Sequence, residues 1–108
     1  MAFDAYDRSL DLLRSLVDPL KKLATRDPDL TRQLRRAAQS VTLNISEANR
    51  RTGKDRAHLF SIALGSAAEV GSCLDAALIF EYLTTADVEE PSGLADRVRA
   101  MTYRLSRK

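Results

Sequence analysis

The sequence has little of what most folds and most chemical sites require. Its 108 residues include four glycines, three prolines, one cysteine, one histidine and no tryptophan. So few glycines and prolines argue against a loop-rich or many-stranded fold and favour long regular elements. A single cysteine, Cys73, excludes an internal disulfide framework. We expect it to be a small core residue of a protein kept in a reducing cytoplasm.

Signals for targeting and for membrane insertion are also missing from the pattern. The first residues carry Asp4 and Asp7 and no apolar segment, so we expect no signal peptide. No apolar run approaches the roughly 20 residues that a membrane span needs. We therefore expect a cytoplasmic protein that does not contact a membrane.

Groups that could perform catalysis are equally scarce. The one histidine, His58, lacks the Glu-x-x-His arrangement of di-iron bundles, and pairing it with Cys73 would give only two ligands. Several serines occur without a nearby base, and Gly53-Lys54 lacks the glycine pattern and strand of a phosphate loop. We expect neither an enzyme nor a resident metal or cofactor.

What the sequence does contain is apolar spacing typical of four helices. We expect the first from Phe3 to Thr25, bent at Pro19, and the second from Pro28 or Leu30 to Asn49. The third should run from Lys54 to Leu83, and the fourth from Ala86 to Ser106 with a break or kink near Pro91. Short connections between them predict a single all-α domain over residues 1–108, an antiparallel up-down-up-down four-helix bundle.

Polar side chains interrupt this regular pattern where the second and third helices should meet. Ser40, Asn44 and Glu47 follow one stripe of the second helix, and the middle of the third helix is built of small residues around Glu69. We expect a polar network in which Arg36 pairs with Glu69; the alternative is a solvated Glu69. The full network is Arg36, Ser40, Asn44, Glu47, Ser66 and Glu69. Gly65 and Gly71 predict close approach of another helix backbone, and the alternative is local flexibility.

The net charge of +2 conceals a segregation of signs. Residues 32–56 hold seven Arg or Lys against two acids, residues 97–108 hold five against none, and the remainder holds five against thirteen. This pattern predicts a basic end or rim, unless these are ordinary solvated helix faces. The candidate phosphate contacts are Arg35, Arg50, Arg51, Lys54 and Arg56, with Arg104, Arg107 and Lys108 as a second patch. Tyr103 is interpreted as a bundle-edge residue rather than a base-stacking platform.

Residues 30–78 resemble a known family. Its pattern is found here as Arg36, Ala37, Ala38, Ser40, Asn44, Ile45 and Glu47, a basic linker over residues 50–56, and then Ala63, Leu64, Gly65, Ser66 and Glu69. The chain looks like the four-helix-bundle proteins encoded by intervening sequences in bacterial large-subunit ribosomal RNA genes. That family includes the accessory variability determinant of diversity-generating retroelements. It often has Pro near Thr42 and Gly at Ala48, and this chain differs at both positions.

The resemblance implies a non-enzymatic bundle that assembles into a ring-like homopentamer. In the retroelement branch it also implies that a basic surface binds nucleic acid and a partner reverse transcriptase. We therefore expect an oligomeric accessory protein that binds the backbone of RNA or DNA. The alternative is an oligomeric scaffold or adaptor for a protein partner, favoured by the acidic remainder of the chain and the broad apolar face of the first helix.

Overall fold

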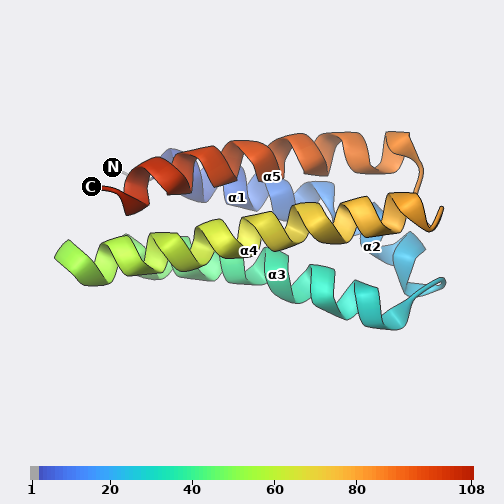
Figure 1. Cartoon of the computed structure of the whole chain (residues 1–108), viewed down its shortest axis with the longest axis horizontal. Coiled ribbons are helices and arrows are strands. Elements are labelled where there is room, and N and C mark those ends of the chain that lie inside the picture. The colour runs from blue at the N-terminus through green and yellow to red at the C-terminus, as the bar shows by residue number, and fades with distance from the viewer. Residues whose placement is uncertain (1–2) are drawn as a thin grey trace.

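A computed structural model describes residues 3–108, and these residues are helical without any strand. The helices are α1 (Phe3–Ser15), α2 (Val17–Ala24), α3 (Pro28–Ala48), α4 (Gly53–Ile79) and α5 (Thr85–Ser106). They form an elongated body of 42 × 22 × 19 Å in which α4 packs along both α3 and α5, and α1 contacts α5 and α3. The N- and C-termini lie at the same end as the α3–α4 connection (Figure 1). The prediction of an all-α fold is confirmed.

The predicted first helix is divided into α1 and α2 at Leu16. Pro19 has no N–H to offer the carbonyl of Ser15, and its ring crowds that carbonyl, so α1 ends four residues before the proline. Backbone hydrogen bonds continue through Leu16, from its N–H to Leu12 (3.2 Å) and from Leu20 N–H to its carbonyl (2.9 Å). α1 and α2 therefore form one bent rod whose buried stripe runs on, and the chain has four rods in residues 3–108.

The remaining helix ends are set by local capping interactions. Asp27 accepts the Leu30 N–H at 2.9 Å and caps α3, which begins at Pro28 as predicted. The connection after α3 turns at Gly53, whose φ of +62° suits glycine. α4 ends at Ile79 rather than at the predicted Leu83, because Glu81 adopts a left-handed φ of +62°. The Tyr82 N–H then bonds Ala77 O at 2.9 Å, which closes a Schellman cap.

α5 runs unbroken from Thr85 to Ser106, so the predicted break near Pro91 is wrong. Pro91 is buried against the bundle, and the helix starts one residue earlier than expected. A reciprocal cap fixes that start: Thr84 Oγ1 accepts the Asp87 N–H, and Asp87 accepts the Thr84 N–H at 2.8 Å. The same carboxylate accepts a hydrogen bond from Lys22, which joins α5 to α2.

The core is built from the apolar stripes of all five helices. Its largest fully buried side chains include Phe60, Leu12, Leu16, Leu34 and Ile45. A side-chain hydrogen bond between two helices lies inside it: the Thr42 hydroxyl donates to Ser9 Oγ at 3.1 Å, and Ser9 donates to the Tyr6 carbonyl. This pair links α3 to α1 and satisfies two buried hydroxyls, a contact that the sequence did not suggest.

α4 is long and apolar enough to cross a membrane by length and composition alone. In this structure it packs between α3 and α5, and 33% of its most apolar window is buried. Core helices of globular proteins pass the same test, so the expectation that the chain does not contact a membrane stays a prediction.

The Asp87 carboxylate gives the fold a defined response to acid. The hydrogen bond from Lys22, helped by the Thr84 N–H, lowers the pKa of Asp87 from 3.8 to about 2. Because the folded-state pKa lies below the ordinary value, this stabilisation is complete above about pH 4 and is lost as the pH falls toward 2.

Replacing Asp87 with Asn should therefore destabilise the fold by about 1 kcal/mol at neutral pH, since the cap loses its charge-assisted bonds. The gap between D87N and the wild type should close as the pH falls from about 4 to 2. Urea unfolding at a series of pH values measures both effects. Asp96→Asn is the matched control, because Asp96 lies on the same helix and is 75% exposed. A gap that is constant with pH would contradict this assignment.

Candidate nucleic-acid interface

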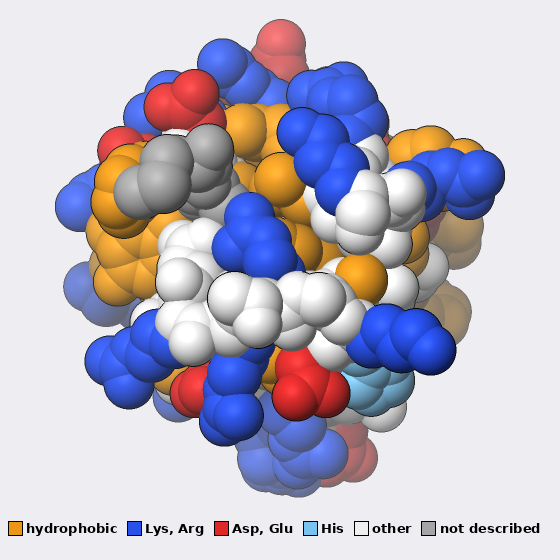
Figure 2. Space-filling view, turned by 90° about the vertical axis from the view of Figure 1, so that its left-hand side faces the viewer, with side chains coloured by type: hydrophobic (Ala, Val, Ile, Leu, Met, Phe, Trp, Pro, Cys, Tyr) orange, Lys and Arg blue, Asp and Glu red, His pale blue; other side chains and the backbone are white. Residues whose placement is uncertain are grey.

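The fold brings the two basic segments of the sequence to one end of the bundle. The α3–α4 connection carries Arg50 and Arg51, and the first turn of α4 carries Lys54. Arg104 lies in the last turn of α5, and Arg107 and Lys108 follow it. Both segments lie at the end where the termini meet (Figure 1). Viewed from that end, Lys and Arg side chains are spread around the face and outnumber Asp and Glu, which appear at several places on it (Figure 2). We call this face the basic end and define it by these six residues.

Most of these side chains are free to reach a partner. All six are exposed, and within residues 3–108 neither Arg50, Lys54, Arg104 nor Lys108 forms a salt bridge. Arg51 pairs with Glu47 at 3.2 Å, a half-exposed contact one helical turn long. Arg107 lies over the ring of Tyr103, 5.2 Å from its centroid. Four of the six side chains of the basic end therefore have no carboxylate partner within residues 3–108.

Two residues predicted to contact phosphate, Arg56 and Arg35, do not belong to the basic end. Arg56 is partly buried: it donates to the Ala48 carbonyl at 3.3 Å and stacks on Phe60 at 4.8 Å, so it caps α3 and ties it to α4. Arg35 lies more than three turns before the end of α3. There it lines an apolar hollow with Leu13, Val17 and Leu20, away from the basic end. Arg35 is therefore separated from the linker arginines, and its contact with phosphate stays a prediction.

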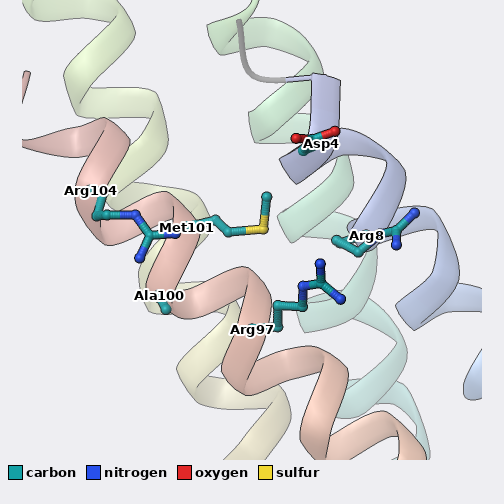
Figure 3. Close-up of a pocket in the computed structure, with 6 residues that line it drawn as sticks. All are labelled: Asp4, Arg8, Arg97, Ala100, Met101 and Arg104. Atoms are coloured by element: carbon teal, nitrogen blue, oxygen red, sulfur yellow. The ribbon is translucent and has the colours of Figure 1, made fainter.

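A second hollow, of about 560 Å³, lies between α1 and α5 beside the basic end. It is lined by Asp4, Arg8, Arg97, Ala100, Met101 and Arg104. Figure 3 shows Arg97 and Met101 extending from α5 toward α1, while the Arg8 guanidinium is directed away from α5. Arg8 pairs with Asp11 at 3.1 Å, and its Nε is buried without a partner in residues 3–108. From the sequence, Arg97 could only be counted among the basic residues of 97–108, because the side of α5 on which it lies was unknown.

The polar seam between α3 and α4 is present, but smaller than predicted. The Ser40 and Ser66 hydroxyls hydrogen-bond across the two helices at 2.7 Å. The Asn44 amide donates to Ser40 Oγ at 3.0 Å and to the Ser40 carbonyl at 2.8 Å. Glu47 lies one turn further on and pairs with Arg51 instead. The seam therefore consists of Ser40, Asn44 and Ser66.

The predicted pair of Arg36 and Glu69 is wrong. Both side chains are exposed, and residues 3–108 contain no ion pair between them. Glu69 follows Ser66 by three residues, so it lies on the outer edge of the seam, where water solvates it. The alternative, a carboxylate in solvent, is the correct one for this chain.

The glycines of α4 also lack the close neighbour that was expected. A Cβ placed on Gly65 or on Gly71 would meet no atom within 4 Å. Small residues do fill the α3–α4 contact, but they are Ala63 and Ala67, which are buried. The glycines lie outside that contact, and within the described chain the space where each Cβ would lie is open.

Residues 3–108 contain no group of three or more His, Cys, Asp or Glu side chains that could hold a metal. Cys73 is buried in the core, as predicted. Burial, and then the nearby Glu69 carboxylate, raise the pKa of the Cys73 thiol. A raised pKa keeps this sulfur protonated and unreactive.

Comparison with known proteins supports the resemblance seen in the sequence. Residues 1–104 match the family described as 23S rRNA-intervening sequence protein. A crystal structure of a protein of unknown function, from the S23 ribosomal protein family of Bacteroides thetaiotaomicron, has the same fold with a TM-score of 0.85. The two chains are 22% identical over 96% of this chain and 99% of that one. No curated protein matches the sequence.

Double-mutant cycles can separate the seam that exists from the ion pair that does not. Ser40→Ala and Ser66→Ala should show a coupling free energy of about 1 kcal/mol, because each hydroxyl leaves the other without its partner. Arg36→Ala and Glu69→Ala should show a coupling near zero, since both groups are solvated. Urea unfolding of the dilute chain gives both values. A larger coupling for the charged pair would reverse the assignment.

Proposed function

The chain belongs to the 23S rRNA-intervening sequence protein family, and from this premise we propose that it is a non-enzymatic, oligomeric protein that binds the backbone of RNA or DNA through its basic end. The observation that carries the proposal is the convergence of Arg50, Arg51 and Lys54 with Arg104, Arg107 and Lys108 at one end of the bundle. Guanidinium and ammonium groups on flexible side chains neutralise phosphates without reading base sequence.

We further propose that the bundle is antiparallel and that copies of it assemble into a ring. α4 presents an exposed strip at helical spacing: Ile62, Gly65, Glu69, Ser72 and Ile79. In an isolated chain this strip is uncovered. Ile79 is then 76% exposed, and Gly65 costs about 1 kcal/mol of helix stability relative to alanine. Both features are explained if the backbone of a neighbouring copy approaches α4 closely.

A complementary surface lies on the opposite helices. The hollow between the α1–α2 rod and α3 has a volume of about 320 Å³ and is walled by Leu13, Leu16, Val17 and Leu20. Lys21 and Arg35 line the same hollow, and the α4 strip contains Glu69 and is flanked by Asp75. Two unlike surfaces that fit each other make a head-to-tail contact, which closes into a ring when the rotation permits. Five copies is the number that the family resemblance implies.

The ring is tested at Gly65. A Cβ at Gly65 meets no atom of its own chain and the position is exposed, so Gly65→Leu should fold and melt no lower than the wild type. In the ring it would push the neighbouring copy away, and sedimentation should show monomers where the wild type assembles. Gly93→Leu is the matched control, because Gly93 is exposed on α5 with equal space around it. Unchanged assembly of the Gly65 variant, or a monomeric wild type, would contradict the ring.

Nucleic-acid binding is tested by its dependence on salt. The wild type should bind RNA or DNA in filter-binding assays at low salt, with affinity falling steeply as salt rises. Arg50→Ala with Lys54→Ala should weaken binding and reduce the slope of log K against log salt by about 2, one for each lost phosphate contact. Arg26→Ala with Arg32→Ala removes the same charge from the other end of the molecule and should change neither.

An absence of affinity at low salt would remove this function and favour the alternative, an oligomeric scaffold for a protein partner. The exposed Ile79 and Phe80 at the far end of α4 favour that alternative if the α4 strip is not covered by another copy. Equal losses from both double variants would indicate a general effect of charge rather than a site at the basic end.

A further inference from the structure

We propose that the exposed face of α5 is a track for single-stranded nucleic acid on which Tyr103 stacks an unpaired base. The inference rests on the proposed function, because the basic end supplies the attraction for phosphates. It adds a preference for the single strand and a residue that produces it. Aromatic stacking is the interaction by which proteins hold unpaired bases without reading their sequence.

The face combines cations with one aromatic ring. The exposed cations here are Arg97, Arg99 and Arg104 in the last three turns of α5, and Arg107 and Lys108 just beyond its end. Tyr103 lies between them and is 48% exposed, although large aromatic side chains usually bury most of their surface. Arg99 and Arg107 are four residues before and after it, so the three side chains form one row along the helix. This is the interleaving of basic and aromatic groups that the sequence alone could not place on a common face.

One face of the ring is already occupied. Arg107 lies over it, 5.2 Å from the centroid, so a base would stack on the opposite face or displace Arg107, and Arg104 comes from the next position of the helix. Tyr103 lines a hollow of about 330 Å³ with Leu64, Arg99 and Arg104, between α5 and α4. A flat apolar group entering this hollow would meet the ring and Leu64, while its phosphates would meet the two arginines. A nucleotide of a single strand has that combination of parts.

The other charged residues around the Tyr103 ring are mostly cations, which favours a nucleic acid as the occupant of the hollow. Asp96 is the acid of this hollow, and it is loosely paired with Arg99 at 3.9 Å. On the side of α5 that faces α1, Arg97 and Arg104 line the hollow shown in Figure 3. Cations therefore flank the row formed by Arg99, Tyr103 and Arg107. A duplex could reach the cations, but its bases are already stacked within the helix and offer no free face to Tyr103.

The test compares a single-stranded 12-nucleotide oligomer with a 12-base-pair duplex of the same sequence, using wild-type, Tyr103→Leu and Tyr103→Phe proteins. Tyr103→Leu should weaken single-strand binding by roughly five- to a hundredfold, the range found when a stacking ring is removed. Duplex binding should stay within about twofold, since duplex binding depends on phosphates alone. Tyr103→Phe keeps the ring and should bind both as the wild type does. Tyrosine fluorescence of the wild type should be quenched by the single strand.

Circular dichroism of both variants should match the wild type, because the side chain lies at the surface. Equal loss of single-strand and duplex binding in Tyr103→Leu would overturn stacking. Unchanged single-strand binding in Tyr103→Leu, together with a loss in Arg50→Ala with Lys54→Ala, would overturn the role of Tyr103 and leave the proposed function standing. A wild type that binds neither nucleic acid would overturn both.

Discussion

The packing of α4 against α3 is the contact on which the rest of the molecule depends. α4 is apolar around most of its circumference, and it can be covered only if neighbours approach on several sides. Ala63 and Ala67 are small enough to let α3 come close, and Ser40 and Ser66 then meet at 2.7 Å. The connection between the two helices spans only residues 49–52, so their contact also fixes where the linker arginines emerge. α5 lies along the other side of α4, which returns its basic C-terminus to the same end.

Much of this arrangement follows from patterns that a sequence displays locally. Helix bounds depend on caps and prolines, so α3 could be predicted from Asp27 and Pro28 to within one residue. The end of α4 could not, because it depends on a left-handed Glu81, a residue that gives no such signal. Pro91 shows the converse: it suggests a break, but burial against the core keeps α5 continuous. Side-chain partners were harder still, since Arg36 and Glu69 lie on adjacent helices yet point to water.

The candidate site was only partly visible for the same reason. A count of charges along the chain identifies basic segments, but it cannot say that residues 50–54 and 104–108 share one end. Nor can it separate Arg56, which caps α3 and stacks on Phe60, from its neighbour Lys54, which is free. Helical spacing placed Tyr103 at the edge of the bundle, and that much agrees with its exposure. Its place in a row of arginines emerges only when the buried side of α5 is known.

The excess of cations at the basic end has no sufficient structural cause. Helix dipoles favour basic residues at C-termini, and α3 and α5 both end there. However, α1 and α4 begin at the same end, and their positive N-termini offset the two negative C-termini. The backbone N–H of Arg51 and the side chain of Arg56 both donate to the open Ala48 carbonyl of α3, and the Arg51 side chain has its own carboxylate. Arg50, Lys54, Arg104 and Lys108 are then cations that form no ion pair within residues 3–108, an arrangement that supports the nucleic-acid binding proposed above.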